Sequence, residues 1–228
     1  MKRSEIDRHI DWAIALCQKQ RFALPAFAYW SPMEWDRRRA EAEHLWNVMQ
    51  GWDATDYARG DFDKVGAVLF TLRNGNIYDP SMGTPYCEKI IAMKAGQLLP
   101  MHFHYSKTED IINRAGGTLC VKVFNSKSEA EGFAIDTQSD VHLRLDGRPV
   151  TLPAGAAVEV GSGDSITLFP YIYHEFYAKP EDGDLIVGEV STINDDRKDN
   201  HFAEPFTLPP IQEDVPARHH LCNGYVQQ

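Results

Sequence analysis

One short stretch of the chain carries two histidines and a glutamate at a spacing that constrains both the fold and the chemistry. His102 and His104 are followed after four residues by Glu109, and His174 stands much later. On an extended strand, side chains at i and i+2 point to the same face, so the two histidines can converge on one point. Glu109 can return to that point after a short bend, and a remote strand must supply His174. The pattern therefore predicts a divalent-metal site enclosed by strands from distant parts of the sequence.

Two glycines frame this stretch. Gly96 precedes it and Gly116 follows it, so the segment reads G-x5-H-x-H-x4-E-x6-G. This pattern resembles the first signature motif of the cupins, small double-sheet β-barrels that hold a metal inside. The second cupin motif is matched more loosely by GDSITLFPYIYH, in which Ile172 takes a position usually held by glycine. The predicted metal ligands are His102, His104, Glu109 and His174.

The first 50 residues predict two helices. An apolar stripe at helical spacing follows a capping-box-like start at Ser4, and Pro25 ends this helix. Ser31 followed by Pro32 is a stronger start signal, because serine caps a helix and proline suits its first turn. We expect this second helix to continue to about Met49.

From about position 63 the pattern changes to short strands between Gly, Pro and Asp turns. Val65–Leu72 ends near Asn74-Gly75, and the alternating segment Val141–Leu145 ends at Asp146-Gly147; both dipeptides are hairpin signals. The other expected strands are Cys87–Lys94, Leu98–His104, Thr118–Phe124, Val158–Val160, Ser165–Phe169, His174–Ala178 and Leu185–Val190.

Many short strands at this spacing predict a mainly β fold. We expect a cupin-type double-stranded β-helix (jelly-roll barrel) with an N-terminal α-helical extension. The expected parts are a helical extension in residues 1–60, the barrel in residues 61–193 and a wrapping tail in residues 194–228.

Charge and composition exclude several classes of partner. The formal net charge of −10 disfavours nucleic acid, because phosphate binding needs a basic surface. No apolar run is long enough to span a membrane. The four cysteines are widely spaced and form no CxxC pair, which favours free thiols and a cytoplasmic location.

The four ligands by themselves leave three chemistries open. A divalent ion with three neutral histidines and one carboxylate is a Lewis acid. It could stabilise the enediolate of a sugar, activate dioxygen, or hydrolyse a substrate through bound water. The ligand set does not choose among them.

A family resemblance narrows the choice. The segments that carry it are HFHYSKTEDIINRAGGTLCVKVFN, LPAGAAVEVGSGDSITLFPYIYHEFYA and GEVSTINDDRKDNHFAEPF. They resemble the D-lyxose isomerase family of sugar-isomerising cupins, and the similarity covers most of the chain. The resemblance implies an aldose–ketose isomerase that interconverts D-lyxose and D-xylulose, and also D-mannose and D-fructose, through a cis-enediol. It further implies Mn²⁺ as the preferred ion, with Co²⁺, Fe²⁺, Ni²⁺ or Zn²⁺ as alternatives, and a homodimer.

The proton-transfer groups must be titratable and near the barrel mouth. Glu204 is the first candidate for the base, on the strength of the resemblance. Lys107 is a candidate to stabilise the enediolate or relay a proton, and Asp196 to bind hydroxyls or share proton transfer. Lys94 is a candidate for substrate binding. Each has a plain alternative as a solvated surface or turn residue.

Three other functions compete with the sugar isomerase. A phosphosugar isomerase would need converging cations, and Arg37–Arg39 is the only basic run, spread over different faces of a helix. An iron-dependent cupin dioxygenase would tolerate the same ligand set. A sugar-binding sensor would keep its ligand after substitution of the base, whereas an enzyme would lose turnover.

Overall fold

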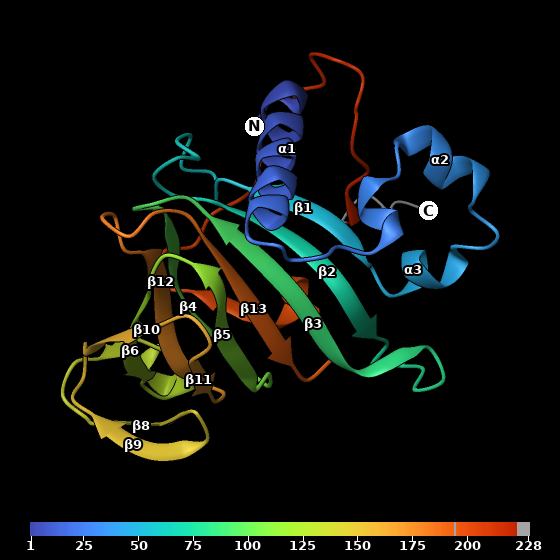
Figure 1. The fold of residues 1–228 in the computed structure, drawn as a ribbon. Coiled ribbons are helices and arrows are strands. Elements are labelled where there is room, and N and C mark those ends of the chain that lie inside the picture. Colours follow the sequence, from blue (N-terminus) through green and yellow to red (C-terminus); the bar gives the residue numbers. More distant parts are fainter. Residues whose placement is uncertain (194, 223–228) are drawn as a thin grey trace.

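In the computed structural model, which describes residues 1–193 and 195–222, the strands form two antiparallel sheets that enclose a common core (Figure 1). The eight-stranded sheet has the order β1 (Gly51–Thr55), β2 (Ala67–Gly75), β3 (Gly83–Met93), β13 (Leu185–Ser191), β5 (Glu109–Gly116), β11 (Ser165–Leu168), β8 (Val141–Leu145) and β9 (Arg148–Leu152). The second sheet has the order β10 (Ala157–Val160), β6 (Leu119–Ser126), β12 (Ile172–Ala178), β4 (Leu98–His104) and β14 (Asn200–Phe202), and β7 (Ile135–Asp136) pairs with β6. This architecture confirms the predicted mainly β fold.

Strand alternation decides which residues face the interior between the sheets. In β3, Ile91 and Met93 belong to the core between the two sheets, whereas Ile90 and Ala92 face the opposite side. Because neighbouring side chains on a strand point to opposite faces, the eight-stranded sheet buries both of its faces in this region. Its outer face is covered by the first helix.

The helix α1 (Arg3–Lys19) lies across the outer face of the eight-stranded sheet (Figure 1). Its buried stripe, which includes Ile6, Ile10 and Ala13, packs against side chains such as Phe70 of β2. The helix starts two residues earlier than predicted, because Ser4 does not cap it. Instead the Ser4 N–H and hydroxyl both donate to the Asp214 carboxylate of the tail.

The second predicted helix is divided. Ser31 caps α2 (Pro32–Arg37) with Glu34, as expected, but this helix ends at Arg37 and α3 (Glu43–Asn47) follows after a turn. The Trp35 and Trp46 rings pack edge to face with their centroids 5.6 Å apart. A continuous helix would separate these positions by ~16 Å along its axis, so the aromatic contact requires the chain to fold back.

The two predicted hairpin turns have different outcomes. Asp146 and Gly147 form the turn between β8 and β9, both with positive φ, as a type I′ turn requires. In contrast, Asn74 and Gly75 lie within β2, and the chain turns after them. Gly75 is needed there because a Cβ would overlap the Thr84 carbonyl oxygen of the neighbouring strand.

The tail is more ordered than the predicted wrapping coil. It contains α4 (Asp196–Asp199) and the short strand β14, which pairs with β4 and places Asn200 opposite His104. A short 3₁₀ helix spans Ala26–Tyr29 and another spans Glu129–Glu131. Among the described helices, none is both long and apolar enough to cross a membrane.

Candidate metal centre

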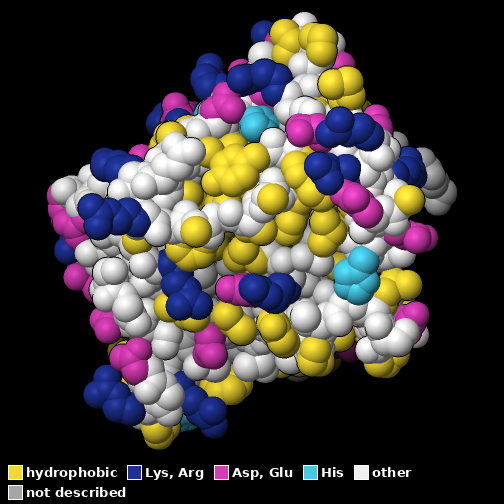
Figure 2. Space-filling model, turned by 45° about the vertical axis from the view of Figure 1, so that its right-hand side comes forward, with side chains coloured by type: hydrophobic (Ala, Val, Ile, Leu, Met, Phe, Trp, Pro, Cys, Tyr) yellow, Lys and Arg dark blue, Asp and Glu magenta, His cyan; other side chains and the backbone are white. Residues whose placement is uncertain are grey.

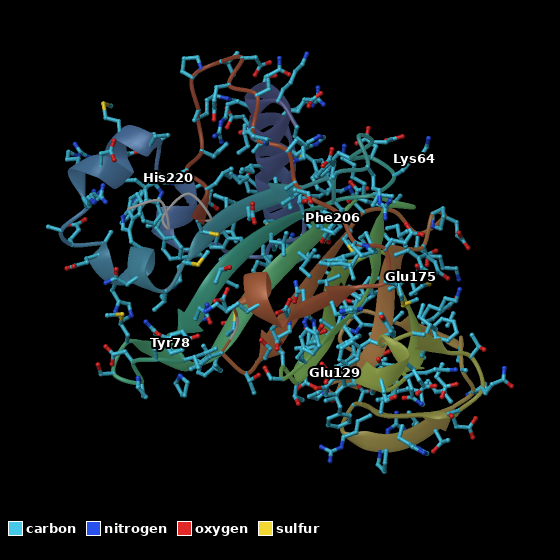
Figure 3. The ribbon with its side chains drawn as sticks, turned by 180° about the vertical axis from the view of Figure 1, so that it is seen from behind. Lys64, Tyr78, Glu129, Glu175, Phe206 and His220 are labelled. Atoms are coloured by element: carbon cyan, nitrogen blue, oxygen red, sulfur yellow. The ribbon has the colours of Figure 1, made fainter. Side chains whose placement is uncertain are left out.

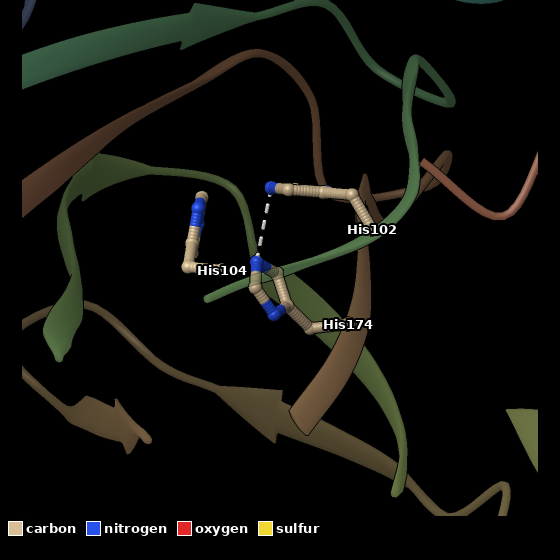
Figure 4. A group of neighbouring side chains, drawn as sticks. All are labelled: His102, His104 and His174. Carbon is tan, nitrogen blue, oxygen red and sulfur yellow. Dashed lines mark hydrogen bonds between the residues drawn. The ribbon is translucent and has the colours of Figure 1, made fainter. Parts of the chain in front are cut away.

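Three histidines converge between the two sheets (Figure 4). His102 and His104 stand on β4, and His174 stands on the neighbouring strand β12, directly opposite His102 in the register. All three side chains are buried, and one ligand atom from each lies within 4.8 Å of the others. The strand spacing predicted from the sequence therefore brings these side chains to one point.

The hydrogen bonds of two of these rings determine the tautomer that each neutral ring adopts. His102 Nδ1 lies 2.8 Å from the Pro100 carbonyl oxygen, and His174 Nδ1 lies 2.9 Å from the Ile172 carbonyl oxygen. A carbonyl can only accept, so both rings donate from Nδ1 and their neutral forms carry a lone pair on Nε2. The two Nε2 atoms are 3.1 Å apart, along the dashed line in Figure 4. Facing lone pairs at this distance repel each other, and a cation between them removes that repulsion.

The electrostatic setting favours neutral histidines. Burial lowers the pKa of His102 well below its usual range, and the nearby His174 and His104 rings lower it further. Burial also lowers the pKa of His104, and the Lys107 ammonium adds to this effect. Neutral imidazole is the form that binds a metal ion, so the site is prepared for one at neutral pH.

Glu109 adds a carboxylate oxygen to the same point. Its Oε1 lies 3.2 Å from His174 Nε2 and 3.4 Å from His104 Nε2. Within the part of the chain that the structure describes, Glu109 Oε1 and His104 Nε2 are buried without a hydrogen-bond partner. Two ligand atoms each ~2.1 Å from an ion lie ~3.0 to 3.4 Å apart, so the three histidines and Glu109 fit a divalent cation.

A β-bulge in β4 sets the direction of the ligands. Between β12 and β4, His174 pairs with His102 but Phe176 pairs with Leu99, so β4 holds one extra residue. The bulge lets both Leu99 and His102 face the cavity although they are an odd number of positions apart. Without it, the histidines and the apolar end of β4 would point to opposite faces.

Beside the histidines, two buried carboxylates share two lysines. Lys107 Nζ lies 2.7 Å from Glu109 Oε2 and 2.9 Å from Glu189 Oε1. Lys89 Nζ lies 3.5 Å from the same Glu189 oxygen. Burial by itself raises the pKa of Glu109, but the Lys107 ammonium and the neighbouring His104 outweigh it and hold that pKa well below its usual range. Lys107 and His104 thus keep the Glu109 carboxylate ionised next to the other histidines.

Lys89 and Glu189 are site residues that the sequence analysis missed. They stand directly opposite each other in the register of β3 and β13. Alternation along β3 was the available signal, because Lys89 shares its face with the core residues Ile91 and Met93. A charged residue on the otherwise apolar face of a strand indicates a buried polar site.

These residues line a cavity of about 300 Å³. This volume is at the lower end for small-molecule sites and suits a single sugar. The lining combines polar side chains with aromatic rings, and the Phe202 ring stacks on His102 with the centroids 5.1 Å apart. Phe206 lies on the side of the eight-stranded sheet opposite α1 (Figure 3). The lining residues used below are Asp53, Thr55, Tyr57, Lys89, His102, His104, Lys107, Glu109, Glu189, Asn200, Phe202 and Phe206.

Two predicted residues lie outside the cavity, and the side chain of a third is not described. The Glu204 side chain is 78% exposed, and its Oε2 accepts from Arg59 Nη2 at 2.6 Å. Lys94 follows Met93, whose side chain faces the core between the sheets, so the Lys94 side chain points to the opposite, outer face of the eight-stranded sheet. Its ammonium binds Asp63 there and lies over the Trp12 ring. Asp196 begins α4, and its side chain lies outside the described part of the structure.

The described residues that line the cavity form no cation cluster for a phosphate. Of the residues that line it, only Lys89 and Lys107 are basic, and both form ion pairs with Glu189. Arg38 lies over the Trp30 ring and binds Glu41, so this part of the basic run is engaged at the surface. Figure 2 shows charged side chains of both signs scattered over one face, without a continuous basic field.

Comparison with known proteins identifies full-length relatives. The sequence profile of a family described as D-lyxose isomerase matches residues 1–225. A D-lyxose/D-mannose isomerase of Escherichia coli O157:H7 is 40% identical over 229 residues, covering 100% of this chain and 99% of the relative. A D-lyxose/D-mannose isomerase of Serratia proteamaculans is 41% identical over 206 residues, covering 90% of this chain and 89% of the relative.

Solved structures share the fold. The L-ribose isomerase of Acinetobacter sp. DL28, in complex with L-ribose, has a TM-score of 0.53 at 19% identity, covering 90% of this chain and 93% of that one. The unliganded L-ribose isomerase of Cellulomonas parahominis has a TM-score of 0.51 at 20% identity, with the same coverage. At this identity the likeness establishes the architecture alone.

Proposed function

The chain belongs to the D-lyxose isomerase family and is a sugar isomerase, and from this premise we propose how it works. It interconverts D-lyxose and D-xylulose, and D-mannose and D-fructose, by proton transfer through a cis-enediol. The observation that carries this function is the full-length match to D-lyxose/D-mannose isomerases. The buried histidines beside a carboxylate pair in a sugar-sized cavity support it.

His102, His104, His174 and Glu109 would hold the metal ion. We propose Mn²⁺ for this site, with Co²⁺, Fe²⁺, Ni²⁺ and Zn²⁺ as the competing ions, because a three-nitrogen, one-oxygen donor set accepts any of them. When bound, the ion supplies positive charge that polarises the sugar carbonyl and makes the adjacent C–H acidic.

Glu189 is the residue that we assign to proton transfer. It is a buried carboxylate that faces the cavity, whereas Glu204 is exposed and bound to Arg59. The Glu189 carboxylate takes the proton from C2, the C2–H electron pair forms the C1–C2 double bond, and the carbonyl π electrons move to O1. The hydroxyl proton then passes from O2 to O1, the carbonyl forms at C2, and the protonated carboxyl returns its proton to C1. Delivery and removal by one group keep the transfer on one face of the enediol, as a cis-enediol path requires.

Lys107 and Lys89 prepare Glu189 for this role. Both ammonium groups lie against its Oε1, so the two ion pairs hold the carboxylate in one position beside the substrate. The Lys107 ammonium also stabilises negative charge that develops on the enediolate.

The rest of the cavity orients the sugar. The Tyr57, Phe202 and Phe206 rings form an apolar wall on which the C–H face of a sugar can pack. Asp53 and Thr55 line the cavity and offer acceptors to hydroxyl groups. Because both lysines are committed to carboxylates, a neutral sugar suits this cavity better than a phosphosugar.

We also propose that the protein is a cytoplasmic homodimer. All four cysteines are free thiols in the structure, which suits a reducing compartment. β9 ends the described eight-stranded sheet and β10 ends the second sheet, and edge strands are common places for subunit pairing. Sedimentation equilibrium decides the oligomeric state.

One experiment tests the proposed function. Protein stripped with EDTA is incubated with D-lyxose and Mn²⁺ in deuterated water without oxygen, and D-xylulose and the deuterium at C1 and C2 are followed. We expect Mn²⁺-dependent ketose formation with deuterium incorporation. No turnover of D-lyxose or D-mannose would overturn the assignment, and activity that requires oxygen and iron would indicate a dioxygenase instead.

A further inference from the structure

Asp199, the last residue of α4, connects the tail to the loop that carries Lys107. Its Oδ1 accepts from the Ser106 N–H at 2.9 Å and from the Ser106 hydroxyl at 2.6 Å. Its Oδ2 accepts from the Lys107 N–H at 3.1 Å, and its carbonyl oxygen accepts from the Tyr105 N–H at 3.0 Å. Four hydrogen bonds to three consecutive residues fix the backbone just before the Lys107 side chain enters the cavity.

The same carboxylate faces the one ligand histidine whose ring is not otherwise oriented. His102 and His174 each donate Nδ1–H to a backbone carbonyl two residues earlier. His104 Nδ1 is buried with no hydrogen-bond partner in the described chain, and Asp199 Oδ2 lies 3.9 Å from it. The Asp199 side chain is 13% exposed, so this is a sheltered charge near a buried imidazole.

We propose that Asp199 is a positioning residue of the isomerase. It orients the His104 ring from the Nδ1 edge and holds the 105–107 loop so that the Lys107 ammonium reaches both Glu109 and Glu189. A carboxylate beside the second ring nitrogen of a metal-binding histidine favours the tautomer that carries its proton there, and at 3.9 Å the Asp199 carboxylate acts on His104 through its charge rather than through a direct hydrogen bond. The end of α4, which leads into β14, therefore positions residues of the site. This inference rests on the proposed function only for its kinetic readout.

The chain contains a matched control at the opposite side of the molecule. Asp214 Oδ1 accepts from the Ser4 N–H at 3.0 Å and its Oδ2 accepts from the Ser4 hydroxyl at 2.7 Å, so it bonds the same two groups of a serine that Asp199 bonds through Oδ1 alone. Asp214 lies in the tail against α1, away from the cavity. Asp214→Asn thus removes a carboxylate that bonds a serine on the exposed surface, without touching the proposed ligands.

The test compares Asp199→Asn, Asp199→Ala and Asp214→Asn with the unchanged protein. Asparagine keeps a carbonyl oxygen for both Ser106 bonds, so Asp199→Asn preserves the fold even where Asp199→Ala does not. Two quantities are measured: the Co²⁺ affinity of EDTA-stripped protein, from its visible absorption, and the kcat and KM for D-lyxose with Mn²⁺.

We expect Asp199→Asn to bind Co²⁺ about 10- to 100-fold more weakly and to lose a similar factor in kcat. KM for D-lyxose changes by less than about 3-fold, because Asp199 does not line the cavity. Asp214→Asn keeps both quantities. The proposal is overturned if Asp199→Asn keeps its Co²⁺ affinity, or if Asp199→Asn and Asp214→Asn lose Co²⁺ affinity by the same factor. Since the Co²⁺ titration needs no sugar, it decides the role of Asp199 even if D-lyxose is not the substrate.

Discussion

At the scale of single residues, the chemistry depends on carboxylates that are buried beside lysines. Glu109 is 2% and Glu189 is 5% exposed, and Lys107 bridges them. Burying an ion is costly unless a partner and hydrogen bonds compensate for lost water. The four-residue network of Lys89, Lys107, Glu109 and Glu189 provides this compensation, and it keeps two carboxylates available in one small cavity.

Glu189→Gln tests the assigned base. We expect kcat to fall by about 10²- to 10⁴-fold, because the amide cannot take the C2 proton. The metal content stays the same, since Glu189 is not among the ligands. Glu204→Gln is the matched control and keeps kcat within about 2-fold. Steady-state kinetics and metal analysis give the answer, and loss of kcat in Glu204→Gln alone would restore Glu204 as the base.

A second residue prediction concerns acid stability. His9 of α1 is 3% exposed, and its ring stacks on Phe62 with the centroids 3.7 Å apart. Burial, followed by the nearby Lys94 and Arg8 charges, lowers the pKa of His9 to about 4. In the unfolded chain the pKa of His9 returns to about 6.5, so the unfolded state binds more protons between these values.

The free energy of unfolding therefore falls as the pH drops from about 6.5 to about 4, and His9 has no such effect above that range. We expect His9→Phe, which keeps the stacked ring, to lose less stability over this interval. Urea denaturation at pH 7 and pH 5 measures the difference. Equal pH dependence in the two proteins would contradict the prediction, and His142→Gln serves as the control at an exposed position of β8.

At the scale of elements, short strands and turns hold the site by register. β4 supplies two ligand histidines, β12 supplies the third, and β14 pairs with β4 beside them. A three-residue strand such as β14 has no periodicity of its own to reveal it in a sequence. The β8–β9 hairpin, by contrast, can be predicted from the sequence, because its two-residue turn requires positive φ and therefore favours Asp-Gly.

Gly147→Ala tests that hairpin. Gly147 has φ of 75°, and no atom lies within 4 Å of the position of a new Cβ, so the cost is one of backbone conformation. We expect the free energy of unfolding to fall by about 1–2 kcal/mol. The kcat for D-lyxose stays unchanged, because the hairpin does not line the cavity. Urea denaturation and kinetics check both statements, and an unchanged stability would show that the turn is not strained by a side chain.

At the scale of the whole molecule, the proposed metal binding would be coupled to folding. The proposed ligands come from β4, β5 and β12, which lie in two sheets, so they meet only in the folded chain. A ligand that binds only the folded state at 100 times its Kd adds about 2.7 kcal/mol to the free energy of unfolding. For a chain of this length that is a rise of about 5–10 °C in Tm.

We therefore expect Mn²⁺ to raise the Tm of EDTA-stripped protein by this amount, and EDTA to reverse the effect. His174→Gln should show a much smaller rise, because it lacks one buried ligand. Differential scanning calorimetry makes the measurement. A rise of the same size in His174→Gln would place the metal elsewhere.

Much of the fold and of the ligand set follows from local sequence patterns. The i, i+2 spacing of His102 and His104 places both on one face of a strand, and Val141–Leu145 is found as predicted because alternation and a turn dipeptide are local signals. The stripe of α1 likewise follows from helical spacing.

Tertiary structure decided what depends on contacts distant in sequence. The Trp35–Trp46 contact divides a helix that local pattern predicts as one. The bulge in β4 sets the parity of its side chains, and pairing of β3 with β13 brings Lys89 to Glu189. Sequence similarity pointed to Glu204 as the base, but only the folded chain shows that Glu189 faces the cavity, because exposure is set by where strands and tail finally lie. Local patterns thus determine which face a side chain takes on its own strand, whereas the partner that it meets there is decided by packing.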